Sequence, residues 1–341
     1  MRALRALTVG VAGAALSLGL VACGSSGGSD TAAGAGGASQ APAASDAAGS
    51  TAAYPRTIKH AMGETQIPAQ PKRVVALDQS FVDAVLTLDT EVVGYTVYRG
   101  IDEKLPEYLA PVMDQAQNIK VVGTLEAPSL EQIIALKPDL IVSAKIRHEA
   151  LYDKLTQIAP TVFSETTGAI WKDNLRLMGQ ALGKEELADE RIKAYEERAA
   201  KIGAAIKEKQ GEMPTVSVAR FTDEPTVRLY VENSYSGLVL KDVGFPRPEG
   251  QPTTTETIMV PISEENIPQL DADHIFVVSY PDPEIEAVQK RFQSNPLWGK
   301  LKGEQHVVDD VTWMSAVGIQ GAHVMLDDLA KMFEVDPAKT F

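Results

Sequence analysis

The sequence predicts an α/β protein with two lobes, each built on a parallel β-sheet, joined by one long helix. Three observations indicate this. The same short helix–strand motif occurs twice, short apolar runs alternate with amphipathic stretches in both halves, and one uninterrupted amphipathic stretch separates the halves. On this basis the N-terminal lobe spans residues 54–170, the bridging helical segment 171–211 and the C-terminal lobe 212–341.

The first 22 residues have the pattern of an export signal. Arg2 and Arg5 precede an apolar run over 6–22, and the only cysteine of the chain, Cys23, follows directly. The stretch LVACG resembles a bacterial lipobox, in which the cysteine becomes the lipidated first residue of the mature protein. A plain signal peptide and a short membrane anchor are the alternatives, although 17 apolar residues are marginal for a span. We therefore expect a lipoprotein anchored on the outer face of the cell membrane.

Residues 24–53 are mostly Gly, Ala and Ser, so they cannot bury enough apolar surface to fold and are expected to form a disordered tether. The chain carries a formal charge of −14, or −16 once Arg2 and Arg5 are removed. This acidity argues against nucleic-acid binding, which requires clustered Lys and Arg. With Cys23 lipidated, no thiol remains for a disulfide or a thiolate metal site.

The N-terminal half alternates strand and helix patterns. The expected strands are RVVAL (73–77), EVVGYT (91–96), LIVSA (140–144) and TVFS (161–164), and the expected helices cover 81–88, 129–136 and 149–159. LIVSA is nearly free of polar residues, as is typical of strands in a parallel sheet that is covered on both faces. Ser129 followed by Gln132 forms a capping-box signature at the start of the second helix.

The C-terminal half follows the same plan. Its expected strands are TVSVARF (215–221), VRLYVE (227–232), IFVVS (275–279) and HVVDD (306–310), with a helix over 236–245 that ends at Gly244. Segments 129–144 and 263–278 match at six of their first thirteen positions when shifted by 134 residues: Ser129/Ser263, Glu131/Glu265, Ile133/Ile267, Leu136/Leu270, Asp139/Asp273 and Ile141/Ile275. The segment SYSGLVLKDVG (234–244) also echoes QSFVDAVLTLD, which follows the first strand of the N-terminal half. We interpret the repeat as a duplicated lobe.

Between the halves, residues from Glu185 to Lys209 include no proline, and Gly203 is the one weak helix former. Apolar residues recur there at three- and four-residue spacing: Leu187, Ile192, Tyr195, Ala199, Ile202 and Ile206. This predicts one amphipathic helix of roughly 37 Å. A covering helix of a single lobe is the alternative, but its position between the repeats favours a bridge.

These features together resemble the substrate-binding lipoproteins of bacterial ABC importers, in the helix-bridged class that carries ferric siderophores, haem and vitamin B12. The resemblance covers the whole mature domain and is carried by PKRVVALDQSFVDAVLTL, SLEQIIALKPDLIVSAKIRHEALYDKLTQIAPTVF, VSVARF with LYVENSYSGLVLKDVGFPRP, and SEENIPQLDADHIFVVS. It implies two Rossmann-like lobes of the class III periplasmic-binding-protein fold. The RHE…Y…L..IAPTV run and the VAR strand are most similar to the ferric-siderophore branch and, within it, to hydroxamate binders.

A siderophore already encloses its iron(III), so the resemblance implies no intrinsic cofactor and no metal-ligand cluster. Arginine suits hydroxamate oxygens because its planar fork donates paired hydrogen bonds, and aromatic walls suit the aliphatic skeleton. The site is expected in a cleft outside the C-terminal ends of the parallel strands. Arg147, just after LIVSA, and Arg220, which ends TVSVAR, match family positions that contact the ligand. A solvated surface charge is the alternative for each.

Aromatic candidates also follow predicted strands. Trp313, past HVVDD, matches a residue that lines the family's pocket, with a core position as the alternative; Tyr98 and Tyr280 are further candidates. The other two tryptophans are assigned to packing: Trp171 and Trp298. Some hydroxamate binders carry an arginine for the ligand in the segment before the repeated helix, where Leu125 stands here.

The resemblance further implies partners. Glu131 and Glu265 occupy the same place in the two repeats and match glutamates that dock on arginines of the permease. Their alternative role is favourable interaction with a helix dipole, because both fall in a first turn. A monomer that captures its ligand, docks on a permease and leaves release to an ATPase is expected. The acidic surface favours a hydroxamate such as a ferrioxamine over a trianionic catecholate, with citrate-type and mixed-ligand complexes also open.

Three rival functions make different demands on the sequence. Binding of a bare metal ion would need converging ligands, but the histidines are widely spaced, without an H-x-H or HExxH pattern: His60, His148, His274, His306 and His323. The adjacent His148 and Glu149 are assigned to ordinary surface chemistry. Haem or cobalamin binding in the same transporter class stays open. An enzyme is disfavoured because the sequence has no G-x-S-x-G motif and no phosphate loop.

Overall fold

The computed structural model describes residues 54–98, 104–280 and 282–339, all within the unit that runs from Ser50 to Phe341. The predicted signal peptide, Cys23 and the predicted tether lie outside the described residues. Within the described ranges, no helix combines the length and the apolar character that a membrane span requires.

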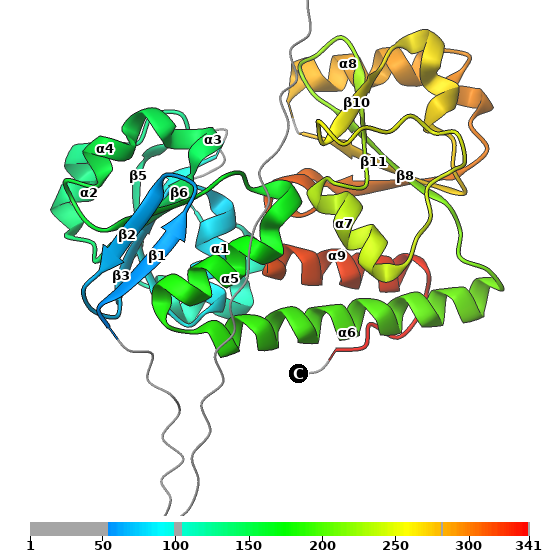
Figure 1. Cartoon of the computed structure of the whole chain (residues 1–341). Helices are drawn as coiled ribbons and strands as arrows, with labels where there is room; N and C mark the ends of the chain where they lie inside the picture. The colour runs from blue at the N-terminus through cyan, green and yellow to red at the C-terminus, as the bar shows by residue number, and fades with distance from the viewer. Residues whose placement is uncertain (1–53, 99–103, 281, 340–341) are drawn as a thin grey trace, which may run out of the picture. The chain divides into compact units, whose positions relative to one another are not determined.

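The N-terminal half, coloured blue to green in Figure 1, contains a five-stranded sheet. Its strand order is β5-β4-β3-β6-β7, and all of its strand pairs are parallel. Its strands are β3 (Arg73–Ala76), β4 (Glu91–Val97), β5 (Lys120–Thr124), β6 (Leu140–Ala144) and β7 (Thr161–Ser164). Its helices are α1 (Gln79–Thr87), the 3₁₀ helix η1 (Glu107–Ala116) and α2 (Leu130–Leu136), followed by the short turns α3 (Lys145–His148), η2 (Glu149–Leu151) and α4 (Tyr152–Leu155). The helix predicted over 149–159 is thus broken into short turns.

Helices cover both faces of this sheet, as the apolar strand LIVSA predicts. Val74 and Ala76 of β3 belong to the core that includes α1 and α5 (Trp171–Leu182), whereas Val75 and Leu77 belong to the core that includes α2 and α4. Successive side chains of a strand point to opposite faces, so one strand contributes to two cores. The predicted capping of α2 is confirmed, since the Ser129 side chain accepts a hydrogen bond from the Gln132 backbone N–H.

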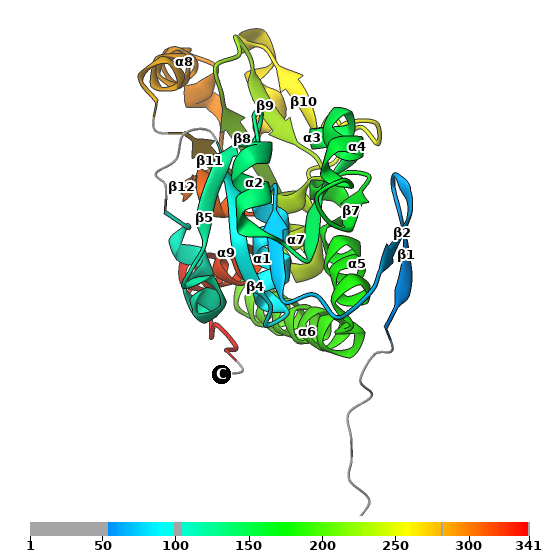
Figure 2. The same ribbon diagram turned by 90° about the vertical axis from the view of Figure 1, so that its left-hand side faces the viewer.

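A two-stranded hairpin precedes the sheet, formed by β1 (Arg56–His60) and β2 (Gly63–Ile67) (Figure 2). It lies against β7 and α5. The backbone N–H of Ala61 donates to the carbonyl of Phe163 at 2.9 Å, the hydroxyl of Thr65 donates to the carbonyl of Thr161 at 2.7 Å, and Tyr54 donates to the carbonyl of Ala181 at 3.0 Å. These contacts attach the start of the described chain to the edge of the N-terminal half.

The C-terminal half holds a second five-stranded sheet, ordered β10-β9-β8-β11-β12. Its strands are β8 (Val216–Phe221), β9 (Val227–Tyr230), β10 (Met259–Ile262), β11 (His274–Ser279) and β12 (Glu304–Asp309). Strands β8, β11 and β12 are parallel, whereas β9 runs antiparallel to β8 and β10 antiparallel to β9. The remaining helices and turns are η3 (Gly168–Ile170), α6 (Glu185–Gln210), α7 (Tyr235–Val243), η4 (Glu264–Leu270), α8 (Pro283–Ser294), η5 (Trp298–Lys300), the π-helical turn η6 (Val311–Ser315) and α9 (Ile319–Met332).

The duplication is visible in the topology. Read in chain order, the strands of each half take the same places in their sheet, and the repeated motif is α2–β6 in one half and η4–β11 in the other. Asp139, just before β6, accepts hydrogen bonds from the backbone N–H groups of Lys72, just before β3, and Arg73, at the start of β3. Asp273 likewise accepts from the N–H of Thr215 just before β8. One difference is that α1 follows β3 directly, whereas α7 follows β9, the second strand of its half.

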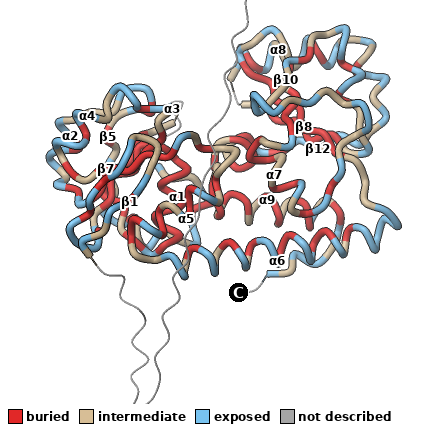
Figure 3. The backbone as a smooth tube through the Cα atoms, in the orientation of Figure 1, coloured by how far each residue is buried: buried red, intermediate tan, exposed pale blue. Residues whose placement is uncertain are grey.

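Helix α6 confirms the predicted long helix between the two sheets, and Figure 3 shows its buried residues along one side. Ile192, Tyr195 and Ile202 of the predicted stripe are buried in the main core. Gly203 is also buried, and a Cβ at this position would lie 1.8 Å from the carbonyl oxygen of Val243. The weak helix former is therefore required for the close approach of α7 to α6.

Helix α9 packs against both α6 and α1. The carboxylate of Asp83 in α1 is fully buried and accepts hydrogen bonds from the backbone N–H groups of Gln320 at 3.0 Å and Gly321 at 3.4 Å, in the first turn of α9. The hydroxyl of Thr87 donates to the same carboxylate. Burial raises the pKa of Asp83 to about 7, although these hydrogen bonds act in the opposite direction.

Candidate ligand-binding site

The predicted arginine of the N-terminal half lies at the C-terminal end of a parallel strand. Arg147 is in α3, directly after β6, and its Nε donates to Oδ2 of Asp78 at 2.9 Å. Asp78 follows β3 and caps α1, where its Oδ1 accepts from the N–H and hydroxyl of Ser80. The Arg147 side chain is 34% exposed, against 7% for Asp78. Within the described residues, Arg147 donates a side-chain hydrogen bond through Nε alone. Its two terminal nitrogens can therefore donate to a ligand.

A buried histidine holds this turn in place. His148 lies between Oγ of Ser143 and the carbonyl oxygen of Leu125, 2.6 Å from each. Because a carbonyl can only accept, Nε2 carries the proton and Nδ1 accepts from the serine hydroxyl. Burial lowers the pKa of His148, which favours this neutral form. The assignment of His148 to surface chemistry was therefore wrong, because the ring is buried and braces the segment next to Arg147.

The predicted arginine of the C-terminal half is buried and paired. Arg220 is 4% exposed on β8, and its Nε and Nη2 donate to the two carboxylate oxygens of Asp310 at 2.6 and 2.8 Å. Its Nη1 donates to the hydroxyl of Tyr230 at 3.1 Å. Burial would lower the pKa of Arg220, but Tyr230 and Asp310 outweigh it and raise that pKa. The surface-charge alternative is wrong for Arg220. Two of its five N–H groups remain for other partners.

The aromatic candidates divide into two groups. Trp313 is fully buried in η6, its indole N–H donates to Asp328 at 2.8 Å, and its ring lies 4.7 Å from that of Phe276. The core alternative therefore describes Trp313, which offers no surface to a ligand in this structure. Tyr98 directly follows β4 and Tyr280 directly follows β11, and both are partly exposed. The packing roles of the other two tryptophans are confirmed by their burial: Trp171 and Trp298.

Sequence reasoning did not identify the acidic partners of the two arginines. Asp78 and Asp310 each follow the C-terminal end of a strand, close to the strand ends that hold the arginines, and this shared location was the available signal. Leu125 stands where some hydroxamate binders carry an arginine. It is apolar and buried, so it offers no charge to a ligand. Glu131 and Glu265, the predicted docking residues, are both exposed in first turns, of α2 and η4.

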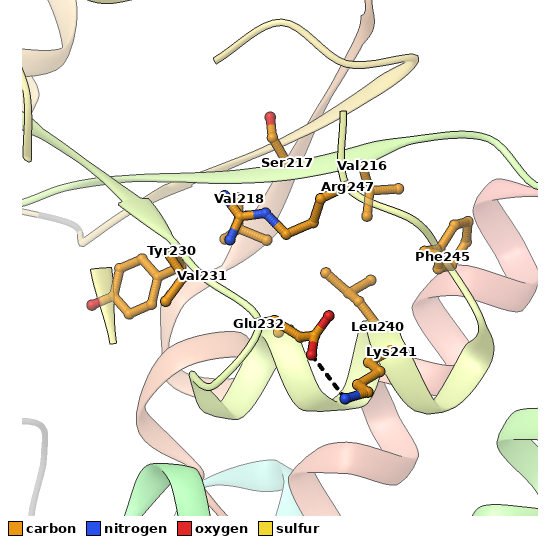
Figure 4. A pocket seen from close by; sticks show the side chains of 11 residues that line it. Val216, Ser217, Val218, Tyr230, Val231, Glu232, Leu240, Lys241, Phe245 and Arg247 are labelled. Carbon is orange, nitrogen blue, oxygen red and sulfur yellow. Dashed lines mark hydrogen bonds and ion pairs between the residues drawn. The ribbon is translucent and has the colours of Figure 1, made fainter. Parts of the chain in front are cut away.

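Two cavities among the described residues are lined by neither Arg147 nor Arg220. One of about 20 Å³ lies between β8, β9 and α7, with Arg247 and Tyr230 in its wall (Figure 4). It has room for about one water molecule. A larger cavity of about 630 Å³ is lined by residues of η1, α6 and α9, including Arg198 and His323.

Two histidines that the sequence separates are brought together at the other end of the second sheet. Nδ1 of His274 lies 2.9 Å from Nε2 of His306, with Glu304 beside them. The expectation of widely spaced histidines was wrong for this pair, because the parallel pairing of β11 with β12 places them on adjacent strands.

Two α/β halves with the same strand order, a single long helix between their sheets, and charged and aromatic side chains at the C-terminal strand ends define a substrate-binding protein of the helix-bridged class. The chain belongs to the periplasmic binding protein family, whose model matches residues 74–306. It is accordingly a transport binding protein and not an enzyme.

Known proteins with related sequences and structures support this assignment. The chain is 38% identical over 293 residues to the probable siderophore-binding lipoprotein YfiY of Bacillus subtilis, covering 82% of this chain and 87% of the relative. It is 31% identical to the achromobactin-binding periplasmic protein of Dickeya dadantii, covering 77% and 86%. The crystal structure of Staphylococcus aureus SirA complexed with staphyloferrin B is similar with a TM-score of 0.75 and 34% identity, covering 83% of this chain and 99% of SirA.

Proposed function

We propose that this protein captures a ferric siderophore outside the cell and delivers it to the permease of an ABC importer. The observation that carries the proposal is the similarity, over most of the chain, to proteins named for siderophore binding. The iron is cargo inside its chelator, so the protein supplies recognition of the chelator alone.

Arg147 and Arg220 are proposed to contact the ligand from a cleft between the two halves. Each belongs to a C-terminal strand end, where ligands bind in open parallel sheets. Each is paired with an aspartate, so the local charge is close to neutral and the remaining N–H groups can donate to siderophore oxygens. Tyr98 and Tyr280 are proposed to supply apolar contact at the same ends.

A hydroxamate such as a ferrioxamine is the ligand class that the sequence motifs favour. A second candidate class is a chelator of the staphyloferrin B kind, because the similar SirA structure holds that ligand at 34% identity. Neutralised arginines suit a hydroxamate complex of low net charge. A strongly anionic complex would instead have to break the ion pairs of Arg147 with Asp78 and of Arg220 with Asp310.

Docking and anchoring complete the proposal. Glu131 and Glu265 are exposed at equivalent places of the duplicated halves, which suits a permease with two matching arginine contacts. Cys23 is proposed to carry the lipid, in line with the lipoprotein named among the relatives. The ATPase that drives import acts on the permease and not on this chain.

The test is a tryptophan-fluorescence titration of the purified protein. The panel contains ferric trihydroxamate, ferric staphyloferrin B, ferric catecholate, haem and cobalamin, with iron-free siderophore as the control. Saturable quenching by one ferric siderophore supports the function and selects its class. Quenching by haem or cobalamin alone would overturn the siderophore assignment while leaving the family intact.

Variants test the site separately. Arg147→Ala removes a partly exposed side chain and should weaken binding without unfolding the protein. Arg220→Ala would leave Asp310 as a buried unpaired carboxylate, so it is compared with the neutral pair Arg220→Met with Asp310→Asn. Undiminished binding by both Arg147→Ala and the neutral pair would refute the proposed contacts but not the function.

A further inference from the structure

The N-terminal ends of β11 and β12 bring together two histidines and a glutamate. In the parallel register His274 pairs with Glu304, and Phe276 pairs with His306. Residues at every second position share one face of a sheet, so His274, Glu304 and His306 project from the same face of adjacent strands. The nitrogen and oxygen atoms that these three residues offer all lie within 4.8 Å of one another.

The distances are close to those of a metal centre. Nδ1 of His274 and Nε2 of His306 are 2.9 Å apart, and each lies 3.9 Å from a different carboxylate oxygen of Glu304. In a tetrahedral zinc site, ligand bonds of about 2.0–2.2 Å place neighbouring ligand atoms about 3.3–3.5 Å apart. The separation of the two nitrogens would therefore have to increase by about 0.5 Å, and the carboxylate would have to approach each nitrogen by about 0.5 Å.

Aromatic neighbours pack against the two imidazole rings, whereas the Glu304 carboxylate is largely exposed. The ring of Phe333 packs edge-on against His274 at 4.7 Å, and Phe276 lies 5.7 Å from His306. The histidine side chains are 15% and 14% exposed, whereas Glu304 is 69% exposed and can close on an ion. Burial, followed by the neighbouring His306, lowers the pKa of His274, which favours the neutral ring that a metal requires.

We propose that His274, His306 and Glu304 form a binding site for one divalent transition-metal ion, of the kind represented by Zn²⁺. Two imidazoles and one carboxylate match the donor preference of zinc, and water can complete a four-coordinate shell. The site is distinct from the proposed ligand residues, because Asp310 follows the opposite, C-terminal end of β12 and Arg220 lies near the C-terminal end of β8, the strand next to β11. A bound ion would link the edge strand β12 to β11.

The experiment is a calorimetric titration of chelator-treated protein with Zn²⁺, with Mg²⁺ and Ca²⁺ as hard-ion controls. One equivalent of Zn²⁺ should bind, while Mg²⁺ and Ca²⁺ give no saturable signal. His274→Ala and His306→Ala should each weaken binding by about tenfold or more, because even partners outside the ligand shell contribute 10–100-fold. His60→Ala removes a histidine of the N-terminal hairpin and should leave the affinity unchanged.

A second measurement guards against misfolded variants. Glu304→Gln alters an exposed side chain, so it should keep the fold while weakening Zn²⁺ binding and changing the visible absorption spectrum of bound Co²⁺. Thermal melting of each variant in chelator establishes that it is folded. Equal Zn²⁺ affinity in wild type and in the double variant His274→Ala with His306→Ala would overturn the proposal, as would the absence of saturable binding to the wild type.

Discussion

The buried carboxylate between α1 and α9 makes a sharp prediction about stability. Asp83→Asn keeps the shape of the side chain but removes its ionisation. The wild-type group titrates near 3.8 when solvated and near 7 in the folded protein. At about 1.4 kcal/mol per pH unit, this difference corresponds to about 4 kcal/mol of unfolding free energy.

The sign follows from proton binding. Between pH 3.8 and about 7 the folded protein holds a proton on Asp83 that the unfolded chain has released, so stability from this group falls as pH rises. Below pH 3.8 both states are protonated and the cost disappears. The side chains of Tyr108 and Tyr235 face Asp83, and burial raises their pKa values, so they stay neutral throughout this range.

The assay is urea unfolding of wild type and Asp83→Asn at several pH values from 4 to 8, followed by circular dichroism. The two proteins should be nearly equal in stability near pH 4, and the variant should be more stable by up to about 4 kcal/mol at pH 8. Asp114→Asn, at an exposed position of η1, is the matched control and should differ little from wild type at every pH. A difference between Asp83→Asn and wild type that does not vary with pH would refute the reasoning.

Two further predictions concern packing and the repeat. Gly203→Ala should destabilise the protein by about 2 kcal/mol in urea unfolding, because the clash with the Val243 carbonyl exceeds the roughly 1 kcal/mol gained in helix propensity; a stabilised variant would contradict the close approach of α7. Asp139→Ala and Asp273→Ala should each cost about 1 kcal/mol through loss of their hydrogen bonds to the strand starts, and the double variant should show the sum. A clearly non-additive double variant would show that the two sites are coupled.

Local patterns predicted the elements well. The helix expected from Glu185 to Lys209 is observed from Glu185 to Gln210, because spacing of apolar residues and absence of proline are local properties of the chain. The capping of α2 by Ser129 was readable for the same reason. The orientation of β9 was not, since an apolar run carries no record of the direction in which a strand pairs.

Contacts across long separations limited the prediction of the site. Arg220 meets Asp310 across 90 positions of the chain, and the location of Asp310 after a strand end does not by itself identify it as the partner. His274 and His306 meet only because β11 and β12 align in one register. The sequence left both a pocket and a core position open for Trp313. The hydrogen bond from its indole to Asp328, which holds it in the core, forms only when η6 packs on α9.

The reversed strand β9 gives the two halves different routes to the folded state. β8 and β9 are consecutive antiparallel strands separated by residues 222–226, so the second sheet can start from a local hairpin. Every strand pair of the first sheet needs a crossover, and closing a longer loop costs more entropy before contacts form. We expect amide protection in β8 and β9 to appear before that of β3 and β6 during refolding. Because synthesis starts at the N-terminus, the half that organises more slowly would be completed first. The two halves would then differ in folding kinetics although their sheets have the same strand order.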